Sequence, residues 1–173
     1  MNRQFKFLLI SILLFSASLF AEAKKYADDI SPKQAFEMQK HGAFIVDVRS
    51  PSEFIHTGHG LGHVNIPVLY QRFKPKSLKT RIQFAEKEMK SSDHQNSRKL
   101  YKVRNLDNRK FVREVAKLTK NNKNADIIVV CHSGERSIYA GNLLADEGYK
   151  NVFNMDEGFF YGWQKQNLPW SVD

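Results

Sequence analysis

The stretch Ile127–Tyr139, I-I-V-V-C-H-S-G-E-R-S-I-Y, decides the fold of this chain. Its four leading apolar residues form a short run typical of a strand that is buried on both faces of a sheet. The run ends at Cys131, and a compact loop follows in which Gly134 gives access to backbone angles closed to other residues. A segment with helical spacing begins at Arg136 and ends near Gly148, a residue typical of helix C-termini. The stretch predicts a strand, a loop that carries a thiol, and the first turn of a helix.

This arrangement favours chemistry at Cys131. Backbone N–H groups at the helix start can face one point, where the helix dipole and Arg136 add positive potential that favours a thiolate. The alternative is that Cys131 is a small, inert, buried residue, as is common for a lone cysteine. The glycine, the arginine and the helix start that follow at once favour the chemical interpretation. Because the chain has one cysteine, it cannot form an intrachain disulfide or a cysteine-rich metal site.

The N-terminus has the pattern of an export signal. Arg3 and Lys6 precede a nearly unbroken apolar stretch at residues 7–20, and Ala21-Glu22-Ala23 has the small-x-small form of a cleavage site. The apolar stretch is shorter than the roughly 20 residues that a membrane-spanning helix needs. We therefore expect residues 1–23 to be a signal peptide and the mature chain to be periplasmic or otherwise exported, with no stable membrane span after cleavage. An uncleaved anchor is the alternative.

The rest of the chain alternates strand and helix patterns. Strands are expected at residues 43–48, 64–66, 127–130 and 151–155, and helices at 32–40, from 51, at 78–89, 111–118, 136–147 and 159–165. Ser31 is expected to cap the first helix and Asp107 the helix at 111–118. This alternation predicts a single α/β domain at residues 24–173, with parallel strands whose ligand site lies beyond their carboxyl ends.

Positive charge is concentrated in the middle of the chain. The formal net charge is +9, and residues 71–123 hold 17 Lys and Arg against 5 Asp and Glu, which is +12 for that segment and −3 for the rest. We expect a basic insertion at about residues 70–110, which includes an amphipathic helix through Leu78, Ile82, Ala85 and Met89. It is either a solvated face or a surface for an acidic protein partner or anionic lipid headgroups. Nucleic acid is not expected, since no basic-aromatic alternation of a binding module is present.

Two groups of polar residues need a role. His56, His59 and His63 are close in sequence, but a glycine-rich turn offers no helix or paired strand to make them converge, so no metal site is predicted. Asp47 lies inside an apolar run, and a buried carboxylate must be bonded. We expect Asp47 to tie down a loop or to pair with Arg49.

Four motifs carry a resemblance to a known family. They are V-D-V-R-x-x-x-E-F from Val46, G-H-x-x-G-H-V-N-I-P from Gly58, V-V-C-H-S-G-E-R-S from Val129 and G-W-Q-K-Q-N-L-P-W from Gly162. In this order they resemble the rhodanese-like sulfurtransferases, of the single-domain exported kind. The resemblance covers most of residues 31–170 apart from the basic middle.

The resemblance implies a central parallel sheet flanked by helices on both faces, and an enzyme that carries sulfur as a persulfide. By position, Cys131 and Arg136 are catalytic. The same resemblance makes His132, Ser133, Gly134, Glu135 and Ser137 the loop that binds a small sulfur-containing anion. It makes Asp47, Arg49 and Glu53 supports of that loop. No metal or organic cofactor is implied.

The implied activity is that of a thiosulfate sulfurtransferase, with cyanide or a thiol as acceptor. The alternatives are a non-catalytic sulfur carrier or binding module and a small cysteine-dependent phosphatase. The phosphatases that are related to this family use Cys-x5-Arg, whereas Cys131 and Arg136 are separated by four residues, which favours sulfur. Glu135 departs from the pattern, since it places a negative charge in a loop that binds anions.

Overall fold

The computed structural model describes residues 24–89 and 100–172. The strands are β1 (Asp28–Ile30), β2 (Phe44–Asp47), β3 (His59–Gly60), β4 (Val64–Asn65), β5 (Leu69–Pro75), β6 (Tyr101–Asp107), β7 (Asp126–Val130), β8 (Asn151–Met155) and β9 (Trp170–Ser171). The helices are α2 (Pro32–Lys40), α3 (Pro51–Thr57), α4 (Leu78–Glu88), α5 (Phe111–Leu118), α6 (Glu135–Asp146) and the π-helix η3 (Gly158–Trp163). The expected signal peptide, residues 1–23, lies outside the described residues.

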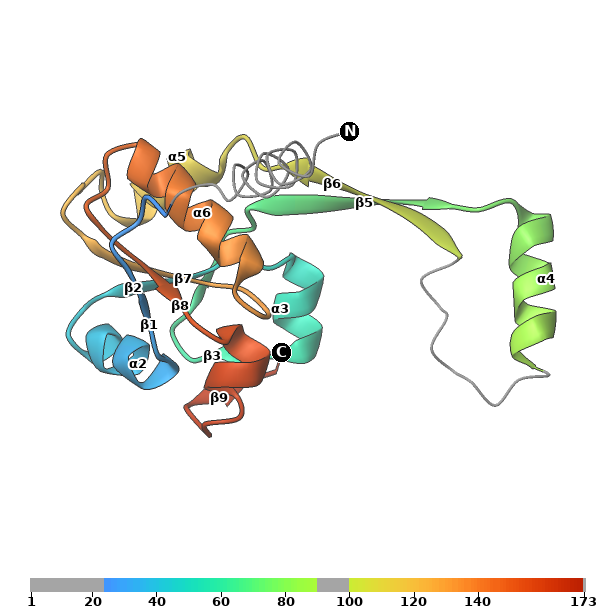
Figure 1. Cartoon of the computed structure of the whole chain (residues 1–173), viewed down its shortest axis with the longest axis horizontal. Helices are drawn as coiled ribbons and strands as arrows, with labels where there is room; N and C mark the ends of the chain where they lie inside the picture. Colours follow the sequence, from blue (N-terminus) through green and yellow to red (C-terminus); the bar gives the residue numbers. More distant parts are fainter. Residues whose placement is uncertain (1–23, 90–99, 173) are drawn as a thin grey trace, which may run out of the picture.

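A five-stranded parallel sheet, in the order β1-β8-β7-β2-β4, forms the centre of the molecule (Figure 1). Its middle strand, β7, consists of D-I-I-V-V, and four of its five residues are buried. Because each strand needs a crossover to reach its parallel neighbour, helices cover both faces. The prediction of an α/β fold with a central parallel sheet and helices on both faces is confirmed.

Each face of the sheet has its own core, because side chains alternate along the strands. On one face, Val46, Ile127 and Val129 pack with Phe111 of α5 and Leu144 of α6. On the other face, Ile45, Ile128 and Val130 pack with Ala35 of α2 and Trp163 of η3. Cys131 continues the first of these faces at the end of β7. The two cores therefore fix the direction in which β7 delivers the cysteine.

Local capping explains where two of the helices start, and one expected cap is wrong. Ser31 caps α2 and Ser50 caps α3, each with proline at the start of the helix and a reciprocal capping box. Asp107 instead ends β6, and α5 begins after Lys110 with no side-chain cap. The backbone N–H of Lys110 is bound by the Asn108 side chain, 3.0 Å away. The aspartate lies too far upstream because the chain first makes a turn there.

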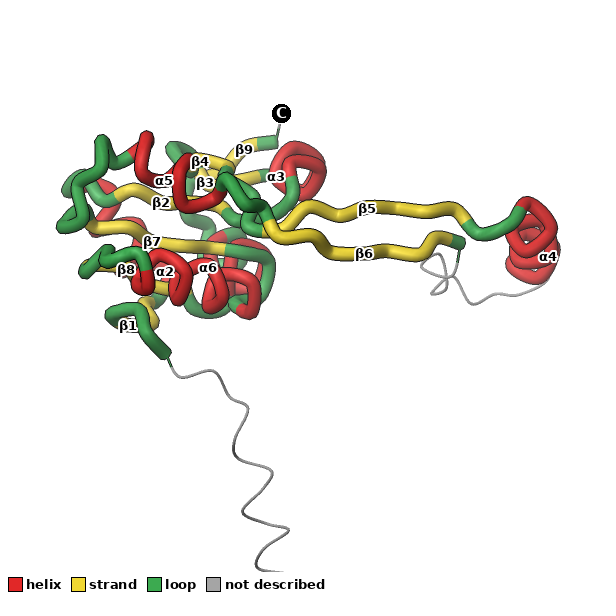
Figure 2. The backbone as a smooth tube through the Cα atoms, turned by 90° about the horizontal axis from the view of Figure 1, so that it is seen from above, coloured by secondary structure: helices red, strands yellow, loops and turns green. Residues whose placement is uncertain are grey.

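The basic segment forms an arm that projects from the body (Figures 1 and 2). We use this name for residues 69–89 and 100–107, in which β5 and β6 pair as an antiparallel two-stranded ribbon and α4 lies at the far end. The predicted helix is present as α4, but the ribbon was not predicted. The body's helices and strands make no extensive contact with α4. The contact of the arm with the core lies at its base, where Leu69 packs against the core on one face of the sheet.

In the part of the chain that the structure describes, no helix is long and apolar enough to cross a bilayer. The closing helix, expected over residues 159–165, is present as a π-helix at Gly158–Trp163.

Candidate active site

Cys131 lies at the carboxyl end of β7, at the start of the loop that leads into α6. Its side chain is buried, with 1% of the residue exposed. Gly134, the residue before α6, has φ +109°, which only glycine adopts without strain, and its N–H points at Sγ of Cys131 over 3.1 Å. The backbone thus supplies a hydrogen-bond donor to the sulfur at the positive end of a helix. This arrangement stabilises negative charge on the sulfur.

Ser137, in the first turn of α6, brings a second donor to the sulfur. Its Oγ lies 3.4 Å from Sγ of Cys131 and 2.7 Å from the carbonyl oxygen of Gly134. A hydroxyl has one proton, so it donates to one of these acceptors at a time. The shorter contact is to the carbonyl, and rotation of the hydroxyl brings the proton to a charged sulfur. Ser137 is fully buried, so water does not compete for it.

Arg136 does not point its guanidinium freely into the loop, because it is paired with Glu53 of α3. Two hydrogen bonds of 2.7 Å join the guanidinium and the carboxylate. Burial alone would raise the pKa of Glu53, but the hydrogen bonds and charge of Arg136 outweigh it and lower the pKa to about 2. The same hydrogen bonds raise the pKa of Arg136. The full positive charge expected beside Cys131 is therefore compensated by a carboxylate.

Glu53 also holds its own helix, because one carboxylate oxygen accepts the N–H of Ser50 at 3.1 Å and its hydroxyl at 2.8 Å. One carboxylate thus links the start of α3 to the start of α6. The role expected for Glu53, support of the loop, is compatible with this placement.

Asp47 and Arg49 form a buried ion pair that lies behind the loop. Nη2 of Arg49 is 2.6 Å from Oδ2 of Asp47 and 2.8 Å from the carbonyl of Gly58. The guanidinium also lies over the ring of Phe159, 4.3 Å from its centroid. The pair thereby joins the end of β2, the end of α3 and η3. The predicted pairing of Asp47 with Arg49 is present, and no hydrogen bond links either residue to Cys131.

The π-helix η3 supports the loop from below, which sequence patterns did not indicate. The N–H of Phe159 donates to the carbonyl of Cys131 at 2.8 Å. Gly158 has φ +63°, and a Cβ there would lie 2.5 Å from the carbonyl oxygen of His132. Only glycine fits this close approach. The His132 ring stacks on Phe160 at 5.1 Å between centroids. The signal that could have found these residues is Gly158 itself, which ends the strand pattern of β8.

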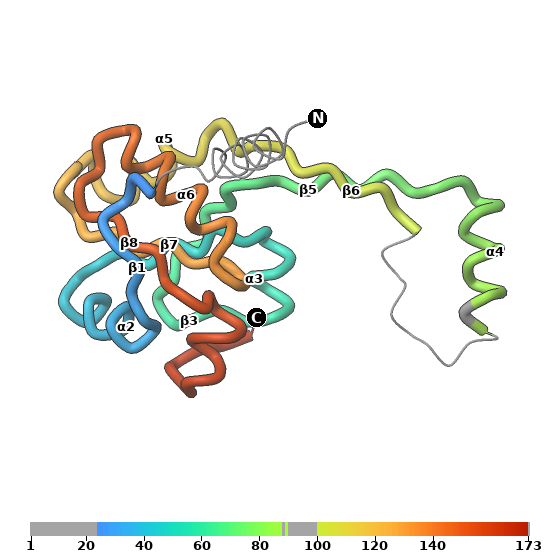
Figure 3. The backbone as a smooth tube through the Cα atoms, in the orientation of Figure 1, coloured from blue at the N-terminus to red at the C-terminus, as the bar shows by residue number. Residues whose placement is uncertain are grey.

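A pocket lies where α3, the start of α6 and the base of the ribbon meet. Figure 3 traces the backbone of these elements. The pocket is lined by Ser50, Glu53, Leu69, Gln71, Asn105, Glu135 and Arg136. Glu135 is exposed and lines this pocket, and Ser133 is exposed as well. Of the residues predicted to bind an anion, Gly134 and Ser137 contact Sγ of Cys131, whereas Glu135 places a negative charge in this pocket.

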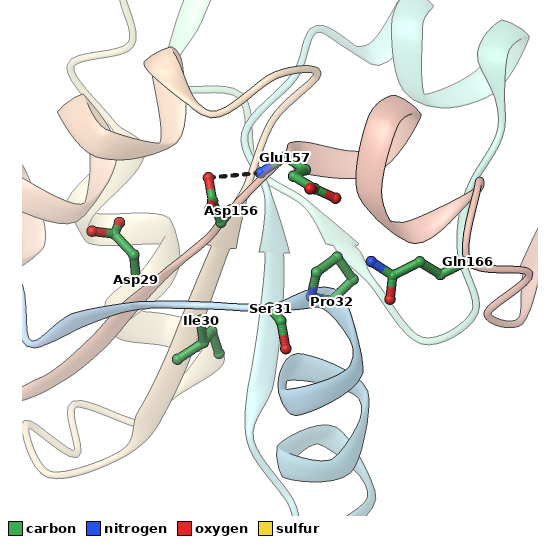
Figure 4. Close-up of a pocket in the computed structure, with 7 residues that line it drawn as sticks. All are labelled: Asp29, Ile30, Ser31, Pro32, Asp156, Glu157 and Gln166. Carbon is green, nitrogen blue, oxygen red and sulfur yellow. Dashed lines mark hydrogen bonds between the residues drawn. The ribbon is translucent and has the colours of Figure 1, made fainter.

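A second pocket lies at the carboxyl ends of β1 and β8 and contains three carboxylates, Asp29, Asp156 and Glu157 (Figure 4). Asp29 is engaged there by Tyr26 and Asn154. The residues that line this pocket include no cysteine, no histidine and no hydroxyl paired with a base, so they offer no activated nucleophile.

The three histidines do not form a metal site. His63 is buried against Trp163, His59 stacks on Phe54 and His56 is exposed. Within residues 24–89 and 100–172, no group of three or more His, Cys, Asp or Glu side chains is arranged to hold a metal ion.

Comparison with known proteins places this site in a family. The model of the rhodanese-like domain matches residues 31–166. The chain is 29% identical over 163 residues to rhodanese-like domain-containing protein 14 of Arabidopsis thaliana, covering 84% of this chain and 66% of that relative, just under two thirds of its length. It is 28% identical over 141 residues to the thiosulfate sulfurtransferase GlpE of Haemophilus influenzae, covering 82% of this chain and 91% of the relative.

A solved structure shows the same fold. Rv0390 from M. tuberculosis superposes with a TM-score of 0.55 at 23% identity, covering 86% of this chain and 99% of the other. The family model spans most of the residues that build the sheet and the loop, including Cys131 and Arg136. The chain belongs to the rhodanese-like domain family.

Proposed function

We propose that this protein is a sulfurtransferase that moves sulfane sulfur from thiosulfate to a thiophilic acceptor through a persulfide on Cys131. The observation that carries the proposal is the N–H of Gly134 aimed at Sγ of Cys131 over 3.1 Å at the start of α6. A sulfur anion held at this point is a soft nucleophile. Hydrogen-bond donors that stabilise the negative charge of the transition state are already in place around it.

The reaction balances without an external oxidant. The Cys131 thiolate attacks the outer sulfur of thiosulfate, a bond forms between the two sulfurs, and the electron pair of the cleaved S–S bond leaves with sulfite. Cyanide or a thiolate then attacks the outer sulfur of the persulfide, and the electron pair returns to Sγ. Gly134 and Ser137 stabilise the sulfur anion before and after each transfer, since both donors lie within hydrogen-bond distance of it.

Two further observations support this function. The chain belongs to the rhodanese-like family, and a relative that it matches over 91% of the relative's length is named a thiosulfate sulfurtransferase. The loop from Cys131 leads into α6 at Glu135, and Glu53 holds Arg136 in the first turn of that helix. We also propose that the protein acts outside the cytoplasm after removal of residues 1–23, on the basis of their sequence pattern.

A sulfur carrier that delivers to a protein is the second candidate. The arm favours it, because small donors and acceptors need no extended surface, and the ribbon of β5 and β6 provides one. A carrier would form the persulfide but turn over slowly with small acceptors.

The test measures thiocyanate formed from thiosulfate and cyanide, with hydrolysis of an aryl phosphate measured in parallel. If the protein is an enzyme, each molecule should form thiocyanate over many turnovers. This activity should be absent in Cys131→Ser, a nearly isosteric change that keeps the fold. A single stoichiometric release of sulfur would support the carrier. Phosphate release without thiocyanate would reject both.

A further inference from the structure

The ribbon of the arm has two chemically different faces. Residues directly opposite each other in an antiparallel pair share a face, and the faces alternate along each strand. One face carries Arg72 opposite Arg104 and Lys74 opposite Lys102. The other carries Gln71 opposite Asn105, Phe73 opposite Val103 and Pro75 opposite Tyr101. We call these the basic face and the apolar face.

The basic face is unfavourable for the isolated protein. Like charges directly opposite each other in a sheet destabilise it, and a single two-stranded ribbon is marginally stable at best. Two such pairs lie on consecutive positions of this face. The charge of the described part of the arm has the same sign, since residues 69–89 and 100–107 hold 8 Lys and Arg against 3 Asp and Glu, a net +5. This charge attracts a negatively charged partner to the arm.

The apolar face is exposed to solvent although its side chains are large. Phe73 is 57% exposed and Val103 is 52% exposed. At the far end, α4 presents Leu78 and Ile82 at 63% and 49%. An exposed apolar patch rimmed by charged residues is typical of an interaction site.

The apolar face continues into the candidate active site. Gln71 and Asn105, from the base of this face, line one pocket together with Arg136 and Glu135 of the loop. Phe73, one step further out, lines a neighbouring pocket that shares Glu53 and Gln71 with the first. A molecule that lies along the apolar face therefore reaches the entrance to the Cys131 loop.

We infer that the arm is the docking surface for an acidic protein that brings the acceptor thiol to Cys131. This inference rests on the proposed function. The partner's thiolate attacks the outer sulfur of the Cys131 persulfide, the S–S bond to Sγ breaks, and its electron pair returns to Sγ. The partner leaves as a persulfide, and the proton of its thiol passes to water. The arm's charge attracts the partner, and the apolar face holds it at the loop.

The shape of the arm favours a protein over a lipid bilayer as its occupant. The apolar face is turned toward α3, because Glu53 of that helix and its cap Ser50 line both pockets together with Gln71. α4 runs down from the far end of the ribbon on the same side (Figure 1). The face is thus flanked by the body at one end and by α4 at the other. A flat bilayer reaches the tip of α4 but not this face, whereas a convex protein surface reaches it.

The experiment compares two synthetic cysteine peptides that share their length and apolar residues and carry either Glu or Lys at the polar positions. The first readout is the rate of sulfur transfer from the Cys131 persulfide to each peptide and to cyanide. The second is the binding of each labelled peptide to Cys131→Ser protein by fluorescence anisotropy, which needs no sulfur. Both are measured across a range of salt concentrations.

Three variants separate charge from apolar contact. The first changes Arg72, Lys74, Lys102 and Arg104 to Gln. The second changes Phe73 and Val103 to Ser. The matched control removes four exposed positive charges from the body by changing Lys33, Arg113, Lys117 and Lys150 to Gln.

The inference predicts that the Glu peptide accepts sulfur about ten-fold or more faster than the Lys peptide at low salt, and that added salt shrinks this advantage. The charge variant loses the advantage through slower association, and the apolar variant loses it through faster dissociation. The control keeps the advantage, and transfer to cyanide stays unchanged in all three.

Equal rates for the two peptides, in a protein that transfers sulfur to cyanide, would overturn the docking surface and leave the proposed function standing. Selective binding of the Glu peptide without sulfur transfer to any acceptor would reject the proposed function and with it the partner's role as acceptor. Arm-dependent binding to vesicles of anionic lipid, or arm-dependent self-association in sedimentation, without a preference between the peptides would replace the acidic protein by another occupant.

Discussion

The charge beside Cys131 is set by a pair of residues that are 83 positions apart in the chain, Arg136 and Glu53. Sequence patterns indicated the nucleophile, its glycine and the pairing of Asp47 with Arg49, because those residues are neighbours in motifs. They did not indicate that Glu53 neutralises Arg136, because that contact depends on how α3 packs against the start of α6. Because two hydrogen bonds join Arg136 to Glu53, the arginine is a partner of Glu53 as much as of the substrate.

Removing Arg136 therefore has two effects. Arg136→Ala removes a charge-assisted contact worth about 1.5–3 kcal/mol and leaves Glu53 unpaired, so thiosulfate turnover should fall roughly ten- to a hundred-fold. The double variant Arg136→Ala with Glu53→Gln should recover part of this loss, since no uncompensated carboxylate remains. The kcat/KM of the wild type, the two single variants and the double variant completes a cycle. Additive losses would show that the pair does not act as a unit.

Ser137 is expected to act as a positioning donor for the sulfur anion. Ser137→Ala removes the hydroxyl 3.4 Å from Sγ and should lower kcat for persulfide formation by about five-fold, the equivalent of one ordinary hydrogen bond of about 1 kcal/mol. Stopped-flow release of sulfite measures this step. Ser171→Ala, at the surface, serves as the control. An unchanged rate in Ser137→Ala would show that the Ser137 hydroxyl donates to the Gly134 carbonyl throughout the reaction and never to the sulfur.

At the scale of elements, the helices and strands of the body were predictable where local signals agree. Ser31 followed by proline marks α2, and the apolar run before Cys131 marks β7. Edge strand β1 was missed, because its sequence is polar and it pairs with β8 only through tertiary contacts. The sequence indicated a closing helix but not that η3 is a π-helix, because the spacing of apolar residues does not show how closely Gly158 approaches the loop carbonyls. The ribbon of the arm was missed since its strands alternate apolar and basic residues without a core to face.

The turn between β3 and β4 buries His63 against Trp163 of η3, with ring centroids 4.5 Å apart. Neither ring nitrogen of His63 has a hydrogen-bond partner among the described residues. Burial, with the charge of Arg49 nearby, lowers the pKa of His63 from 6.5 to about 3. Between pH 6.5 and about 3, His63 is therefore protonated in the unfolded chain and neutral in the folded protein.

The free energy of unfolding should therefore fall as the pH decreases below 6.5, by up to about 1.4 kcal/mol per pH unit from this residue, and the loss should level off near pH 3. Urea unfolding of the wild type and of His63→Phe at pH 7.5 and 5.5 measures the effect. The slope attributed to His63 should be absent in the variant. Parallel pH dependences in the two proteins would contradict the assignment.

At the scale of the whole molecule, the protein consists of a body that holds the chemistry and an arm whose exposed faces contribute little to the core. The two cores lie on the sheet, and the large side chains of the arm remain exposed. Composition indicated that residues 71–123 are unusually basic, but charge alone does not specify shape. The arm projects because most of its residues do not pack against the body, and composition does not show which residues pack.

Shortening the arm should leave the body folded. Replacing residues 72–104 by an Asn-Gly turn joins Gln71 to its cross-strand neighbour Asn105 in a tight hairpin. The midpoint of thermal unfolding should shift by no more than about 4 °C, equivalent to about 1 kcal/mol, because the described parts of the removed segment, residues 72–89 and 100–104, make no extensive contact with the body. Calorimetry of both proteins measures the shift. Loss of the cooperative transition would show that the arm is part of the folding unit.

The intact mass of the protein after incubation with thiosulfate shows whether Cys131 accepts sulfur. We expect a gain of one sulfur atom, located on Cys131 by peptide mapping, absent in Cys131→Ser and removed by cyanide. A wild-type protein that gains no sulfur from thiosulfate or from any other sulfane donor would contradict the proposed function.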